Sequence, residues 1–119
     1  MYEKCKKEDI IEKQTREEKE VYEIDIEGTK LICICDGTIY REMKSGFWKQ
    51  IENKRNHNKG YNVILIKKRQ YMRSKIILMS QKRINSSQKN INIYHINGDR
   101  LDCGVTNLTF DVQHKIQSP

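Results

Sequence analysis

The fold of this chain is decided by two neighbouring stretches of sequence, Tyr94-His95-Ile96-Asn97-Gly98-Asp99-Arg100-Leu101-Asp102 and, after a short gap, Thr106-Asn107-Leu108. A strand is expected at residues 92–95 and another at 108–112, and a polar loop with an Asn-Gly pair joins them. The pattern therefore predicts a β-hairpin. His95 ends its first strand, and Asn107 lies twelve residues later, just before the second strand.

The chain upstream of this hairpin is also rich in strand patterns. Apolar runs bounded by turn residues predict strands there. They lie at residues 21–26, 31–35, 38–41 and 61–66, with turns at 27–30 and 36–37. A basic turn follows at 67–70 and leads into a returning strand that begins at Tyr71.

Two segments admit different readings. Residues 74–84 could form a helix or a strand, and in the helical reading Ser74 is the N-cap. Phe47, Trp48 and Ile51 are expected to form a small apolar cluster.

The first 20 residues are dense in Glu and Lys, with Ile10 and Ile11 as the apolar pair inside them. Without an apolar stripe, they are expected to form a charged helix or an arm. Because this segment is acidic where the rest is basic, it could mask the basic surface or contact a protein partner.

The net charge of +7 is unevenly distributed. Residues 1–29 carry six basic and ten acidic side chains, a net of −4, whereas the rest carries 17 basic and six acidic side chains, a net of +11. Each Lys or Arg that meets a phosphate releases counterions, which supplies affinity without sequence preference. The charge therefore predicts a nucleic-acid partner, and by itself it does not distinguish duplex DNA from RNA, because phosphate attraction serves both.

Composition also bears on location. An apolar run of 18 or more residues is missing, so neither a membrane span nor a membrane partner is expected. The four cysteines (Cys5, Cys33, Cys35 and Cys103) do not have the spacing of a zinc knuckle. Free thiols predict a reducing intracellular compartment, namely a host cytoplasm or nucleus, or a virion.

Together these patterns predict an α+β fold: small antiparallel sheets and hairpins, then a truncated ββα motif, preceded by a charged helix or arm. The expected parts are the arm at 1–20 and one domain at 21–119. That domain divides into a β-rich part at 21–73, a helix or strand at 74–84 and the ββα-like motif at 91–119.

This chain resembles the HNH homing-endonuclease family, including its phage and viral members. Over about residues 37–112 the resemblance is carried by short motifs that keep the family's order. They are Gly37-Thr38-Ile39-Tyr40, Trp48-Lys49, Gly60-Tyr61-Asn62-Val63-Ile64-Leu65, the basic run 67–73, His95 through Asp102, and Asn107-Leu108.

The resemblance implies roles for individual residues. His95 matches the general base that activates water, and Asn107 matches the asparagine that holds the loop. Basic side chains match elements that lie along nucleic acid: Lys67, Lys68, Arg69, Arg73, Lys75 and Arg100. The family's cofactor is Mg²⁺, which would be needed only if the chain were an active nuclease.

The chain departs from the family where the metal is bound. Tyr94 stands where the family has an aspartate ligand, and Ile116 stands where it has a polar ligand. Asp99, Asp102 and His114 are the candidates for displaced ligands, although none is a strong one. The expected function is therefore a degenerate HNH-like protein that binds nucleic acid and has lost cleavage. The alternatives are an active HNH-type endonuclease with displaced ligands and a structural component of a nucleoprotein assembly, such as a ribosome-like particle or virion.

Overall fold

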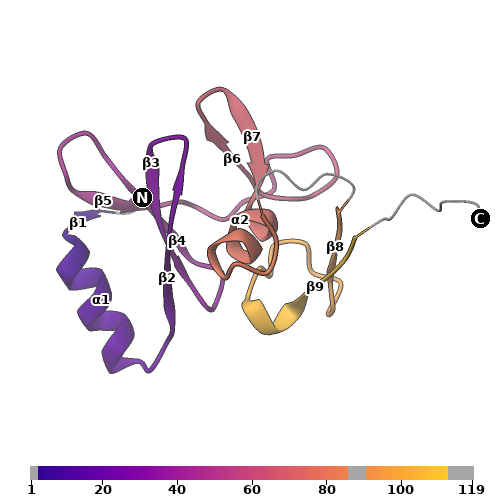
Figure 1. Ribbon diagram of the computed structural model, residues 1–119, viewed down its shortest axis with the longest axis horizontal. Helices are drawn as coiled ribbons and strands as arrows, with labels where there is room; N and C mark the ends of the chain where they lie inside the picture. The colour runs from indigo at the N-terminus through magenta and orange to yellow at the C-terminus, as the bar shows by residue number, and fades with distance from the viewer. Residues whose placement is uncertain (1–2, 86–90, 113–119) are drawn as a thin grey trace, which may run out of the picture.

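The computed structural model describes residues 3–85 and 91–112. In this part of the chain the fold is mixed α+β, with mostly antiparallel strands and two α-helices (Figure 1). The elements are β1 (Lys4–Cys5), α1 (Lys7–Arg16), β2 (Val21–Ile26), β3 (Thr29–Ile34), β4 (Ile39–Glu42), β5 (Trp48–Gln50), β6 (Val63–Ile66), β7 (Arg69–Met72), α2 (Arg73–Ser80), β8 (Ile91–His95), the 3-10 helix η1 (Val105–Asn107) and β9 (Leu108–Val112). The expected α+β class is confirmed at this level.

A five-stranded antiparallel sheet with the order β1-β5-β4-β3-β2 forms the N-terminal half. Figure 1 shows α1 along one side of this sheet and α2 on the other. Side chains of β3 therefore enter two separate cores, with Ile32 and Ile34 in the core under α1, and Leu31 and Cys33 in the core under α2. This explains why β3 is continuously apolar from Leu31 to Ile34, whereas β2, at the sheet edge, alternates.

The N-terminal segment is a helix that packs on the sheet. Ile10 is 3% exposed and Gln14 is 4% exposed, and Ile10 joins the core that contains Trp48. Ahead of the helix, Cys5 in β1 pairs with Trp48 in β5. Of the two expected forms, the helix is the one present. The buried side of this helix is formed by Ile10 and Gln14, which are four residues apart. Because Gln14 is polar, the sequence shows no apolar stripe there.

Helix α2 corrects one prediction about its start. Residues 73–80 are helical, but the N-cap is Met72, and the hydroxyl of Ser74 is buried without a hydrogen-bond partner among the described residues. Residues 76–79 are all buried. Every residue of α2 except Lys75 is buried, so the first turn of the helix is enclosed as well and Ser74 does not lie at a solvated end.

The expected cluster of Phe47, Trp48 and Ile51 is wrong. Trp48 packs into the core beneath α1, Ile51 packs against the core beneath α2, and Phe47 is 41% exposed. Side chains alternate between the two faces of an extended segment, so Trp48 and Ile51, three positions apart, enter different cores, and Phe47 precedes the strand.

Two further hairpins follow the sheet. Strand β6 pairs with β7, and β8 pairs with β9, with His95 opposite Leu108. The hairpin predicted from residues 92–95 and 108–112 is confirmed. The turn before β7 is shorter than expected, because Arg69 already pairs with Ile66.

The sheet and the C-terminal half meet at two buried points. Arg73, 1% exposed, donates from Nη1 to the Gly37 carbonyl at 2.9 Å and from Nη2 to the Ile51 carbonyl at 2.7 Å. Its Nε donates to Asn62 Oδ1 at 2.8 Å. Gly37 has φ +95°, and a Cβ there would lie 2.8 Å from the Cys103 carbonyl carbon, so glycine is required for this approach.

Candidate functional site

The loop between β8 and β9 begins immediately after His95. The Ile96 amide donates to the Asn107 carbonyl at 2.8 Å, and the Gly98 amide donates to the His95 carbonyl at 2.9 Å. These bonds extend the hairpin by one pair and then turn the chain at Gly98, which has φ +78°. The loop therefore leaves the strands in a defined direction.

Asn107 holds this loop with its side chain. Its Oδ1 accepts from the Asn97 amide at 3.0 Å, and its Nδ2 donates to Asn97 Oδ1 at 3.0 Å and to the Asp102 carbonyl at 2.9 Å. The Asn107 side chain thus joins the two ends of the loop by three hydrogen bonds. Asn97 is its reciprocal partner, and sequence reasoning had assigned it only to the turn.

The two loop carboxylates are engaged within the loop itself. Asp99 Oδ1 accepts from the Leu101 amide at 3.0 Å. Asp102 Oδ1 accepts from the Gly104 amide at 3.2 Å, and Asp102 Oδ2 accepts from Asn97 Nδ2 at 2.8 Å. These bonds are typical of Asx turns, which satisfy backbone amides without a ligand.

His95 is half-buried beside an aromatic ring and a thiol. The centroids of the His95 and Tyr61 rings are 5.9 Å apart, and His95 Nε2 lies 3.9 Å from Cys103 Sγ. Burial lowers the pKa of His95 below its ordinary value, Asp102 and Asp99 oppose this shift, and Arg100 adds to it. The imidazole is therefore favoured in its neutral form, which can accept a proton.

Cys103 is not an activated nucleophile despite its histidine neighbour. It is 2% exposed, and burial raises its pKa to about 12. A thiol with such a pKa stays protonated near neutral pH and has little reactivity. All four cysteines are free thiols.

The residues around His95 do not fit the family's Mg²⁺ ion. Tyr94, in the position of the family's aspartate, is 49% exposed and pairs with Thr109 across the hairpin. Within residues 3–85 and 91–112, groups of three or more His, Cys, Asp or Glu side chains that could hold a metal are missing. Mg²⁺ needs at least one or two available carboxylates, whereas Asp99 and Asp102 already bind the loop. His114 and Ile116 lie outside the described residues.

Arg100 ties the loop to an earlier segment. Its guanidinium lies 5.0 Å from the centroid of the Tyr61 ring and donates to the Lys59 carbonyl. Asn53 Nδ2 donates to the Leu101 carbonyl at 2.6 Å nearby. Tyr61 thus contacts both His95 and Arg100. The sequence indicated Tyr61 only as part of a Gly-Tyr motif and did not predict these contacts.

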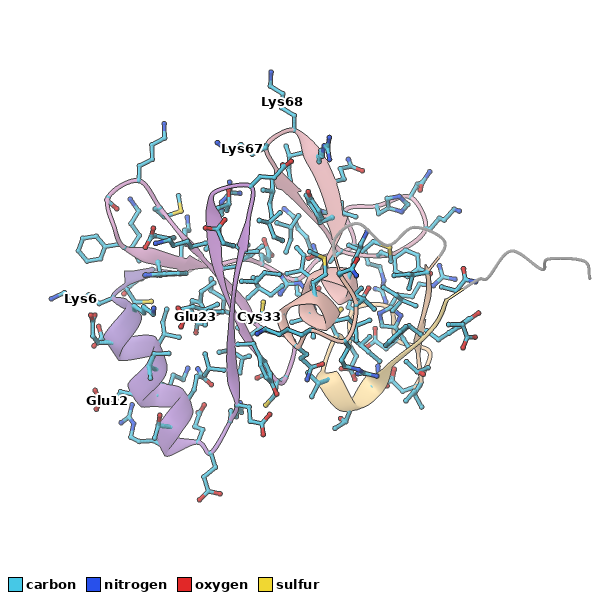
Figure 2. All side chains as sticks on the ribbon, in the orientation of Figure 1. Lys6, Glu12, Glu23, Cys33, Lys67 and Lys68 are labelled. Atoms are coloured by element: carbon cyan, nitrogen blue, oxygen red, sulfur yellow. The ribbon has the colours of Figure 1, made fainter. Side chains whose placement is uncertain are left out.

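The basic hairpin β6–β7 carries three exposed cations at its tip. Figure 2 shows Lys67 and Lys68 at the turn, with Lys68 pointing away from the body of the protein and Lys67 extending to the side of the hairpin. Both have positive φ, 49° and 67°. Arg69 lies 3.9 Å from Glu27 of the neighbouring hairpin tip, and Lys75 is half-exposed on α2.

Arg73 must be removed from the nucleic-acid candidates. Its side chain is enclosed, and its guanidinium hydrogen bonds point into the protein, to Asn62, Gly37 and Ile51. Sequence reasoning placed it on the hairpin because it continues a basic run, but β7 ends at Met72 and Arg73 begins the buried helix.

Comparisons with protein-family models, curated proteins and solved structures returned no match. Neither helix in the described ranges is long and apolar enough to cross a membrane.

Proposed function

We propose that this protein is a degenerate HNH-type domain that binds nucleic acid, duplex DNA in the first instance, and has lost metal-dependent cleavage. One observation carries the proposal: an asparagine clamp closes the loop of a two-stranded hairpin that ends in His95. The clamp, formed by Asn107 and Asn97, keeps the arrangement that the resemblance implies.

The β6–β7 tip supports the binding part of the proposal. Two-residue hairpin turns with left-handed residues usually contain Asn-Gly. Lysines there cost roughly 1–2 kcal/mol per residue in backbone energy, and they place two ammonium groups at the most projecting point of the hairpin. Such a tip can approach a phosphate backbone with little steric hindrance.

The state of the acidic groups supports the loss of cleavage. A Mg²⁺-dependent nuclease needs carboxylates that face the water or phosphate. In this loop Asp99 and Asp102 accept hydrogen bonds from their own segment, and Tyr94 supplies a phenol in place of a carboxylate. His95 retains a neutral imidazole, but a base alone does not stabilise the leaving oxygen.

The binding part is tested by fluorescence anisotropy with labelled duplex DNA over about 50–200 mM salt. The double variant Lys67→Gln/Lys68→Gln is expected to weaken binding and to lower the slope of log K against log salt by about 1.8. Lys13→Gln/Lys30→Gln is the matched control, because both lysines are exposed and lie on the α1 side of the sheet. Equal losses of affinity in the two double variants would show that binding depends on net charge and not on the position of the lysines.

The cleavage part is tested with supercoiled DNA and Mg²⁺ or Mn²⁺. No nicking is expected from the wild type. Nicking that disappears in His95→Ala would overturn the loss of cleavage and favour an active nuclease with displaced ligands.

A further inference from the structure

Three cations form a row across the sheet. Strand register places Lys4 of β1 opposite Lys49 of β5, and Lys49 opposite Arg41 of β4. Residues directly opposite in antiparallel strands share a face, with Cβ atoms about 4.5–5.5 Å apart. Lys4, Lys49 and Arg41 are therefore three neighbouring cationic residues on one face of the sheet, called the row below.

This row lies on the sheet face away from α1. Arg41 pairs in register with Leu31, whose side chain is in the core beneath α2. Helix α2 packs on β2 and β3, at the other end of the sheet order from β1. Next to the row is a cleft of about 510 Å³ lined by Lys4, Arg41, Glu42, Met43, Lys44 and Ser45. Glu42 pairs in register with Trp48, whose side chain lies in the core beneath α1, so this carboxylate alternates to the other face of β4.

The row has no internal counter-ion. Within residues 3–85 and 91–112, no carboxylate forms an ion pair with Lys4, Lys49 or Arg41, although Lys7 and Lys19 elsewhere do have such partners. Like charges directly opposite in a sheet destabilise it. The unliganded sheet thus carries a repulsion that bound anions would relieve.

The row is continuous with the hairpin already assigned to nucleic acid. Arg41 Nη1 donates to the Leu65 carbonyl of β6 at 3.0 Å, two residues before Lys67. In Figure 1 the β4–β5 and β6–β7 hairpins project toward the same side of the molecule. A strand of nucleic acid on the hairpin tip can therefore continue across the sheet.

We infer that the row Lys4-Lys49-Arg41 binds the phosphate backbone of a nucleic-acid strand and extends the basic surface from the hairpin to the N-terminal strand. This inference rests on the proposed function. Neighbouring strands are about 4.8 Å apart, so the row spreads its charge over more than one phosphate group, and a polymer fits it better than a single phosphate ion. In this inference the N-terminal segment contributes Lys4 to the basic surface.

The test compares Lys4→Gln/Lys49→Gln with the wild type in the anisotropy assay and in thermal unfolding. Binding is expected to weaken, and the salt slope to fall by about 1.4 for single-stranded and about 1.8 for duplex nucleic acid. At the same time the Tm is expected to rise, because the variant removes the repulsion. Weaker binding by a more stable protein is a combination that damage to the fold does not produce.

The control Lys13→Gln/Lys30→Gln is expected to keep the wild-type affinity without a rise in Tm. If the row variant binds like the wild type, or loses no more affinity than this control, the inference is overturned. If Lys67→Gln/Lys68→Gln weakens binding and Lys4→Gln/Lys49→Gln does not, the inference about the row is overturned and the proposed function is retained. If the wild type has no affinity for nucleic acid at low salt, both the inference and the proposed function are overturned.

A competition experiment tests the choice of a polymer as the ligand. Equal competition by inorganic phosphate and by an oligonucleotide of the same phosphate concentration would overturn that choice.

Discussion

The loop after His95 and the row Lys4-Lys49-Arg41 treat their polar groups in opposite ways. In the loop, Asn107 and Asn97 bond each other reciprocally and the carboxylates bond backbone amides. In the row, like charges face each other across three strands. The loop satisfies its polar groups internally, whereas in the described residues no carboxylate forms an ion pair with the row and only Arg41 has a protein acceptor, the Leu65 carbonyl.

These two arrangements have opposite effects on stability. Internal hydrogen bonds each contribute about 1 kcal/mol and hold a conformation. Unpaired cations subtract from stability but attract polyanions over a Debye length of about 8–10 Å. The loop is therefore held in one conformation by its own polar groups, whereas the row presents positive charge on one face of the sheet.

The largest expected effect is at the residue that joins the two halves. Arg73→Met keeps most of the side-chain volume but leaves the Gly37 and Ile51 carbonyls and Asn62 without their donor. Buried acceptors without donors cost about 1–3 kcal/mol each, so the free energy of unfolding is expected to fall by about 3–5 kcal/mol in urea denaturation. Lys75→Met, at a half-exposed site on the same helix, is the control. An Arg73→Met protein as stable as this control would show that the two halves are held together by apolar packing alone.

The next effect is expected in the loop. Asn107→Ala removes three side-chain hydrogen bonds and is expected to lower the free energy of unfolding by about 2 kcal/mol. Hydrogen exchange of the Asn97 amide should accelerate, since that amide donates to Asn107 Oδ1. Thr106→Ala, at the exposed neighbour, should change neither. Unchanged exchange at Asn97 would contradict the assignment of Asn107 as the clamp.

A smaller effect of opposite sign is expected in the row. Lys49→Glu places a carboxylate between Lys4 and Arg41 and should raise the free energy of unfolding by about 1 kcal/mol at low salt. The same change at Lys30, which faces Asp25 in register, creates a like-charge pair and should lower it. Chemical denaturation at low and high salt measures both. Equal signs for the two variants would mean that cross-strand charge does not govern this sheet.

The smallest expected effect is a pH dependence from His95. Burial lowers its folded-state pKa below the ordinary value of 6.5, so the folded protein binds a proton less readily than the unfolded chain. Its contribution to stability is complete above pH 6.5 and is lost as the pH falls through the folded-state pKa. Urea midpoints on both sides of this pH should show the decline, and His95→Gln should reduce it. An NMR titration that places the pKa of His95 above its ordinary value would contradict burial as the dominant influence on this imidazole.

Local patterns predicted the hairpins well. Alternation and turn residues predicted β2, the strand that ends at His95 and its pairing with the strand from Leu108, because a period of two and an Asn-Gly turn are properties of neighbouring residues. The resemblance also indicated Asn107 as the residue across the loop, because the spacing from His95 determines which side chain can reach it.

Contacts between distant segments were not visible in the same way. The basic run 67–73 reads as one surface, but the chain enters α2 at Arg73 and encloses that side chain, while Lys67 stays at the tip. Ser74 lost its expected role as a cap for the same reason. In the N-terminal helix, Gln14 fills a core position that no hydrophobic pattern would identify.

By itself, the sequence determined most local elements of this protein: its strands other than β1 and β5, its turns, the spacing between His95 and Asn107, and an excess of positive charge after residue 29. The tertiary structure alone decided which of those charges share a surface. Lys4, Arg41 and Lys49 are far apart in sequence and become neighbours only through the pairing of β1, β5 and β4. The physical reason is that periodicity is set by the backbone within one segment, whereas burial and charge proximity depend on which segments pair across the sheet.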